Sequence, residues 1–134
     1  MQLFFYGTLM AGAGNAVARA AHGCLGPGCV GQVAGALYVI ADPQGCYPAL
    51  VPGAGWVRGM VHMALPGLDL AALDAYEGPE YRRQAVAAHT AAGVVAAEGY
   101  VWAGALPVGA QPIPHGDFTL YLRENGLRAY GQTA

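Results

Sequence analysis

Serine and lysine are both absent from this 134-residue sequence. Without serine, a serine nucleophile is impossible. Without lysine, the chain cannot form a Schiff base with a substrate or with pyridoxal phosphate, and it cannot supply the phosphate-binding lysine of a P-loop. The composition therefore excludes several large classes of enzyme before any motif is considered.

Charged residues are also scarce: they make up 10% of the chain, and the formal net charge is −2. The six arginines are scattered and form no basic stripe, so we expect no nucleic-acid partner. No apolar run has the length needed to span a bilayer. The first residues lack the positive and long apolar regions of a signal peptide, so we expect no membrane partner and a cytoplasmic location.

Cysteine is limited to Cys24, Cys29 and Cys46. An odd number of cysteines without a secretory signal predicts reduced thiols. Together with His22 these residue types could suit zinc, but no C-x-x-C pair is present, so we expect no metal site. The stretch 12–18 is a weak match to a dinucleotide-binding turn, because it lacks the third glycine and the later acidic residue.

The pattern of apolar residues and turn signals predicts one domain over residues 1–134. Its expected order of elements lacks the regular alternation of a doubly wound sheet and favours an α+β protein. We expect a small mixed β-barrel or a strongly curled sheet, flanked by a few short helices. Expected strands cover 2–6, 32–40, 46–51, 56–65, 81–89 and 94–103; expected helices cover 15–22, 69–76 and 117–125; expected turns and loops cover 26–28, 42–45 and 107–114.

Glu77 is expected at the C-terminal end of the helix 69–76, just before the helix-terminating pair Gly78-Pro79. Unpaired carbonyl groups make the field negative at this end of a helix, so we expect the pKa of Glu77 to be raised. Tyr76 and Tyr81 could desolvate it further. A carboxyl group with a raised pKa can transfer a proton near neutral pH. The alternative is a solvated glutamate at a frayed helix end.

A glycine turn follows the first expected strand, at Tyr6-Gly7-Thr8-Leu9. Glycine lets a backbone approach a ligand closely, and several N–H groups are exposed where the chain leaves a strand. These groups could hold a carboxylate or a carbonyl oxygen. The alternative is an ordinary connection between a strand and a loop.

Three segments together resemble the γ-glutamylcyclotransferase-like superfamily. They are Tyr6-Gly7-Thr8-Leu9, Leu73-Asp74-Ala75-Tyr76-Glu77 and Tyr81-Arg82-Arg83. Members of the superfamily open with a strand and a Y-G-[ST]-L loop, and carry a glutamate in L-D-x-[FY]-E followed by Y-x-R. Weaker matches at 47–50, 57–61 and 115–118 extend the resemblance over nearly the whole chain. The resemblance implies a small β-barrel flanked by helices.

The resemblance also implies a reaction: a small-molecule γ-glutamyl amide is cleaved by its own α-amine, which releases 5-oxoproline and a free amine. Glu77 would be the catalytic acid and base, and no metal or other cofactor would be needed. An alternative of a different class is a barrel of the same family that binds a small ligand without turning it over. The identity of the leaving amine and the oligomeric state stay open. The residues implied to bind substrate are Tyr6, Gly7, Thr8, Leu9 and Tyr81.

Overall fold

A computed structural model of the chain describes residues 1–7, 19–21, 23–43 and 45–128. Its framework is a six-stranded sheet with the order β3-β1-β5-β4-β2-β6. The strands are β1 (Gln2–Phe5), β2 (Leu25–Asp42), β3 (Gly45–Ala64), β4 (Tyr81–Thr90), β5 (Gly93–Trp102) and β6 (Gln111–Pro112), and the helices are α2 (Leu70–Glu77) and α3 (Phe118–Asn125).

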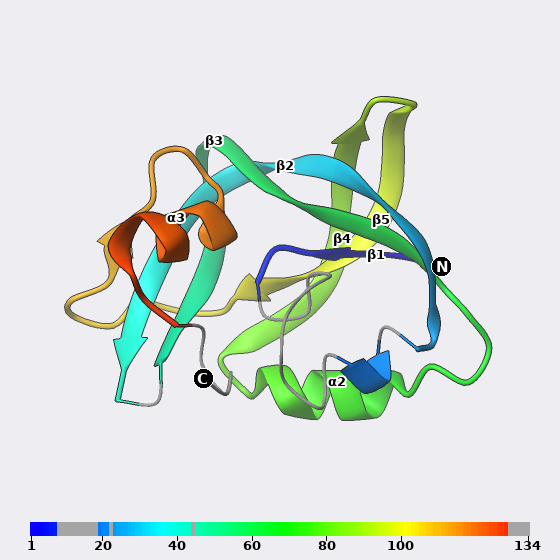
Figure 1. Cartoon of the computed structure of the whole chain (residues 1–134), viewed down its shortest axis with the longest axis horizontal. Coiled ribbons are helices and arrows are strands. Elements are labelled where there is room, and N and C mark those ends of the chain that lie inside the picture. The colour runs from blue at the N-terminus through cyan, green and yellow to red at the C-terminus, as the bar shows by residue number, and fades with distance from the viewer. Residues whose placement is uncertain (8–18, 22, 44, 129–134) are drawn as a thin grey trace.

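The sheet is mixed and strongly curled (Figure 1). β1 runs parallel to β5, whereas the remaining pairs are antiparallel. The curl brings β2 into pairing with both β4 and β3, so strands distant in the sheet order meet again. The prediction of an α+β protein with a curled mixed sheet and short helices is confirmed. Within the described part of the chain, no helix is long and apolar enough to cross a membrane.

β2 and β3 form one long hairpin, whose paired ends are Asp42 and Gly45, as the predicted turn at 42–45 requires. Two other expectations were wrong. The expected turn 26–28 lies inside β2, and the expected strands 46–51 and 56–65 belong to one strand, β3. Register shifts near Leu25/Gly28 and Ala34/Ala36 take up the extra residues. Glycine and proline here bend the hairpin without ending it, as they do at β-bulges.

Local signals predicted the remaining elements well. Asp69 caps α2 by accepting a hydrogen bond from the Ala72 N–H at 3.0 Å, and Asp117 caps α3 in the same way. The expected strands 81–89 and 94–103 are present as β4 and β5, which pair as an antiparallel hairpin. The short strand β6 lies within the stretch 107–114, which was expected to be a loop throughout. The expected helix 15–22 lies largely outside the described residues.

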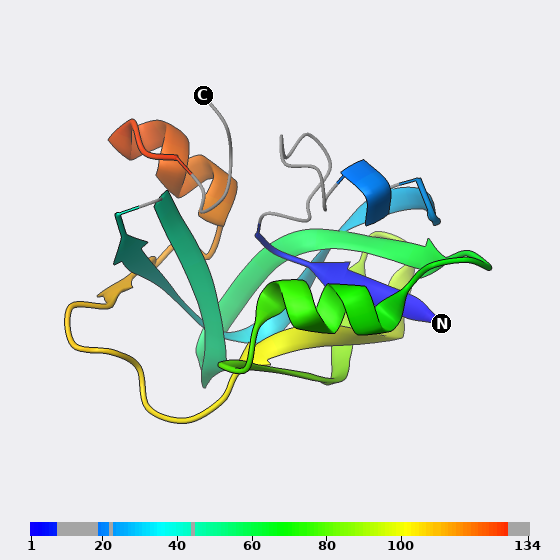
Figure 2. The same ribbon diagram turned by 90° about the horizontal axis from the view of Figure 1, so that it is seen from below.

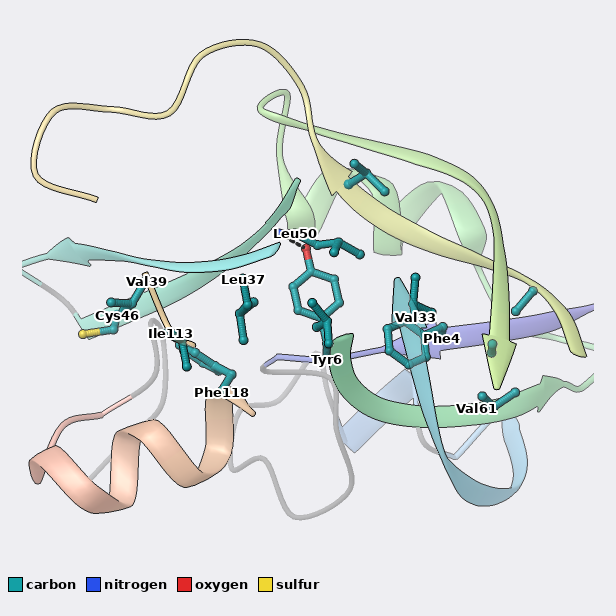
Figure 3. Packing of buried hydrophobic residues seen from close by; sticks show 14 residues of the cluster. Phe4, Tyr6, Val33, Leu37, Val39, Cys46, Leu50, Val61, Ile113 and Phe118 are labelled. Carbon is teal, nitrogen blue, oxygen red and sulfur yellow. Dashed lines mark hydrogen bonds between the residues drawn. The ribbon is translucent and has the colours of Figure 1, made fainter. Parts of the chain in front are cut away.

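Alternate residues of β1 face two different sets of neighbours, as the two-residue period of a strand requires. Leu3 and Phe5 pack with Leu73 of α2. Phe4 faces the main core, together with Tyr6 just beyond the strand (Figure 3). Figures 1 and 2 show that β1 and α2 run in roughly the same direction, so their C-terminal ends lie on the same side of the molecule. This arrangement brings Tyr6 and Gly7 together with Glu77.

Candidate active site

A pocket of about 300 Å³ lies where β1 and α2 end. Four of the residues predicted from the sequence line it together: Tyr6, Gly7, Glu77 and Tyr81. Thr8 and Leu9 lie outside the described residues. The pocket thus brings the end of β1 together with the end of α2 and the start of β4, which lie far from β1 in the sequence.

Tyr6 is buried, with 4% of its surface exposed, and stands at the centre of the main core (Figure 3). Its hydroxyl group donates a hydrogen bond to the carbonyl oxygen of Tyr100 at 2.6 Å and accepts one from the Leu50 N–H at 3.1 Å. Burial raises the pKa of Tyr6, so the hydroxyl stays protonated. Because both bonds go to the backbone, Tyr6 fixes the pocket wall through its hydroxyl.

Tyr81, the first residue of β4, contacts the same pocket wall from another strand. Its hydroxyl group donates a hydrogen bond to the carbonyl oxygen of Pro48, and its ring meets Trp102 edge to face with centroids 5.2 Å apart. Burial is the main cause of a raised pKa at Tyr81. Tyr6 and Tyr81 together therefore hold the segment 48–50, which lies within the weak sequence match at 47–50.

Gly7 is required by the close approach of Pro48. A Cβ atom at position 7 would lie 2.7 Å from Cγ of Pro48, a separation that real Cβ atoms essentially never show. The glycine of the turn therefore has a packing function in the pocket wall, whatever its N–H group binds.

Glu77 is the last residue of α2 and is partly buried at the pocket. Its pKa is raised from an ordinary value of 4.5 to about 7, first by burial and then by the negative charge of Asp74. The direction agrees with the expectation, but burial is the largest cause, whereas the sequence argument began from the helix end. A carboxyl group with this pKa can both accept and release a proton near neutral pH.

A charged cluster lies beside Glu77 on its own helix and the neighbouring sheet. The Arg83 Nε donates to Asp74 Oδ1 at 3.0 Å, and Arg83 also donates to Glu98. Arg83 and Asp74 thus form an ion pair between β4 and α2. The hydroxyl of Tyr100 donates to the same Asp74 oxygen at 2.6 Å.

Sequence reasoning did not select Asp74 or Tyr100 as site residues. Asp74 lies within the L-D-x-[FY]-E motif at helical spacing from Glu77, and this spacing could have indicated it. Tyr100 and the acid Asp42, both in the pocket wall, come from strands whose register no local signal sets. Glu80 and Tyr47 also line the pocket.

Metal binding was considered for the cysteines together with His22, which lies outside the described residues. Cys24, Cys29 and Cys46 are free thiols, with Cys46 buried and Cys29 exposed. Across the described residues, no group of three or more His, Cys, Asp or Glu side chains is arranged to hold a metal ion.

The raised pKa of Glu77 predicts a specific dependence of stability on pH. Between about pH 4.5 and pH 7 the folded protein binds more protons at this group than the unfolded chain does, so stability falls as the pH rises through that window. Glutamine does not titrate, so Glu77→Gln removes this pH dependence. We expect the free energy of unfolding of the variant, relative to that of wild type, to rise by on the order of 2 kcal/mol as the pH is raised from about 5 to about 8. Urea unfolding at both pH values measures the gain. Equal pH dependence in the two proteins would contradict the raised pKa.

Comparison with known sequences and structures shows what this chain is similar to. No curated protein matches the chain in sequence. Several solved structures share the fold. An uncharacterised protein from Pyrococcus horikoshii has a TM-score of 0.70 at 21% identity, over 94% of this chain and 96% of that one. An AIG2-like protein from Mus musculus has a TM-score of 0.62 at 18% identity, over 99% and 87%.

The third structure is a γ-glutamyl cyclotransferase, with a TM-score of 0.61 at 17% identity over 100% of this chain and 91% of that one. At these identities the likeness shows the fold alone. The family model described as γ-glutamyl cyclotransferase, AIG2-like, matches residues 3–120, which include most of β1, all of α2 and the β4–β5 hairpin. The chain therefore belongs to the γ-glutamyl cyclotransferase, AIG2-like family.

Proposed function

We propose that this protein is a cyclotransferase that releases 5-oxoproline and a free amine from a γ-glutamyl amide, with Glu77 as acid and base. The observation that carries the proposal is the Glu77 carboxyl group, whose pKa is about 7, in the wall of a pocket beside Tyr6 and Gly7. Membership of the family supports cyclotransferase activity in general.

The proposed reaction is an internal acyl transfer. The Glu77 carboxylate takes a proton from the α-amine of the substrate, and the nitrogen lone pair attacks the γ-carbonyl carbon to close a five-membered ring. As the bond from that carbon to the leaving nitrogen breaks, Glu77 returns the proton to the leaving nitrogen. No water is consumed and no group is oxidised or reduced, so the atoms of the substrate divide between 5-oxoproline and the amine.

The shape of the pocket supports such a step. A volume of about 300 Å³ suits a small molecule. The attacking and leaving groups belong to one molecule, so holding that molecule in a near-attack conformation supplies much of the acceleration. The rigid wall made by Tyr6, Tyr81 and Pro48 can hold it there. We also propose that N–H groups of Gly7, Thr8 and Leu9 bind the glutamyl part.

The domain and the cellular compartment of this activity are proposed from the pocket lining and the free thiols. The pocket draws on β1, β2, β3, α2, β4 and β5, so we propose that residues 1–134 act as one domain. The free thiols of Cys24, Cys29 and Cys46 support a reducing compartment, which we take to be the cytoplasm.

The test is release of 5-oxoproline from a panel of γ-glutamyl amides that differ in the leaving amine. We expect at least one amide to yield 5-oxoproline and its amine in equal amounts, because the reaction divides one molecule into these two. Mass spectrometry of both products measures the ratio. If the protein binds panel members but releases no 5-oxoproline, the binding-barrel alternative replaces this proposal.

A further inference from the structure

Asp74 lies one helical turn before Glu77 on α2, so both side chains project from the same side of the helix. Its carboxylate accepts a hydrogen bond from the Tyr100 hydroxyl at 2.6 Å and two from Arg83, from Nε at 3.0 Å and from Nη2 at 3.4 Å. Its backbone carbonyl accepts the Gly78 N–H at 3.1 Å, the bond that closes the last turn of the helix. Asp74 is thus held by two strands and by the helix end.

The partners of Asp74 are themselves fixed in the sheet. Arg83 and Tyr100 are directly paired residues of β4 and β5. Arg83 also donates a hydrogen bond to Glu98, which lies two residues before Tyr100 on β5. The backbone carbonyl of Tyr100 accepts the hydroxyl of Tyr6. One residue, Tyr100, therefore joins the last turn of α2 to the tyrosine at the other side of the pocket.

We infer that Asp74 is a positioning residue for Glu77: it anchors the last turn of α2 to β4 and β5, and it keeps a fixed negative charge one helical turn from the Glu77 carboxyl group. Its consequence for catalysis rests on the function proposed above. Its electrostatic consequence for Glu77 does not, because that can be measured in the absence of substrate.

Asp74 can supply this charge because it stays ionised. The hydrogen bonds from Arg83 are the largest cause that holds the pKa of Asp74 low, and the Tyr100 hydroxyl adds to them. Arg83 is shared with Glu98, so the three charges of Asp74, Arg83 and Glu98 sum to a net negative charge. A negative charge near Glu77 favours its protonated form.

Other titratable groups also surround Glu77. Tyr6, Tyr81 and Tyr100 face it from the end of β1, from β4 and from β5. All three are neutral near pH 7, because tyrosine ordinarily ionises only near pH 10 and burial raises their pKa values further. Among the described residues that line the pocket, none is positively charged. The remaining titratable groups of the lining are Asp42, Tyr47, Tyr76 and Glu80.

Two variants separate the charge of Asp74 from its structural contacts. Asp74→Asn and Arg83→Gln both break the same ion pair, but the first removes a negative charge near Glu77 and the second removes a positive one. We expect the midpoint of the Glu77 titration to fall by about 0.5 to 1 pH unit in Asp74→Asn and to rise by a similar amount in Arg83→Gln. The ¹³C NMR signal of the Glu77 carboxyl carbon measures it, with Glu77→Gln used to assign the signal.

The positioning role has its own measurement, which uses the best substrate of the panel. At the optimum pH of each protein, we expect Asp74→Asn to lower kcat about tenfold and to change KM less than twofold, because Glu77 moves while the rest of the pocket stays. An unchanged kcat would overturn the positioning role. In the titration, midpoints that move in the same direction in both variants, or that do not move, would overturn the electrostatic role.

The outcomes also distinguish this inference from the proposed function. If no protein releases 5-oxoproline but the two midpoints move in opposite directions, the function fails and the influence of Asp74 on Glu77 stands. If wild type turns over its substrate but the midpoints do not move, the function stands and the inference fails. If Asp74→Asn does not fold, Arg83→Gln alone tests the inference. A Glu77 titration midpoint that falls or stays unchanged in Arg83→Gln then overturns it.

Discussion

Replacing Glu77 by glutamine is expected to lower kcat for 5-oxoproline release by about 10²- to 10⁴-fold, the usual contribution of a positioned acid–base group. Glutamine has nearly the same size and shape, but its amide cannot take the proton from the α-amine and return it to the leaving nitrogen. The loss should therefore appear in kcat, with KM changed much less. Initial rates with the best substrate of the panel measure it.

The matched control is Glu124→Gln, which removes the same charge from the exposed surface of α3, where Glu124 pairs with His115. We expect its kcat to equal that of wild type. A Glu77→Gln protein that keeps its rate within a few fold of this control would show that Glu77 does not transfer the proton. The profile of kcat/KM against pH gives a second check, since wild type should lose activity below about pH 7 as Glu77 becomes protonated.

Gly59→Ala is expected to lower the free energy of unfolding by about 3 kcal/mol, as overpacking against a rigid backbone does. A Cβ atom at position 59 of β3 would lie 2.2 Å from the carbonyl oxygen of Phe5 and 2.8 Å from the ring of Phe4. Phe4 is fully buried, so neither group can move without shifting β1. Because Tyr6 follows β1 directly, the shift should also lower any activity of the pocket.

The control for this variant is Gly26→Ala in β2, where the nearest atom to an added Cβ is 3.5 Å away, an ordinary contact. We expect this variant to stay within about 1 kcal/mol of wild type. Urea unfolding of the three proteins gives the two differences. Equal losses in Gly59→Ala and Gly26→Ala would contradict the argument from the close approach of β1 and β3.

Glu77 was predictable because its signals are local. The pair Gly78-Pro79 ends the expected helix 69–76, and this places Glu77 at the helix end without any knowledge of the fold. The burial that raises the pKa of Glu77 was only partly predictable. It depends on which groups of β1 and β4 come to lie against that helix end.

The tyrosines show the limit of the same reasoning. Their motifs placed Tyr6 and Tyr81 near a pocket, and the structure brings both to it. Their hydrogen-bond partners, the backbone groups of Tyr100, Leu50 and Pro48, are distant in the sequence. No spacing within the chain indicates such partners, because they are set by the pairing of strands.

By itself the sequence determined the chemistry that is open to this protein and most of its local structure. The absence of serine and lysine limits the nucleophiles, and capping residues and turn glycines define α2, α3 and the β4–β5 hairpin, because these act over a few residues. Only the tertiary structure decided the long β2–β3 hairpin with its register shifts, and the cluster that joins Asp74 to Arg83 and Tyr100. These features depend on long-range strand pairing, which buries side chains far apart in the chain against one another.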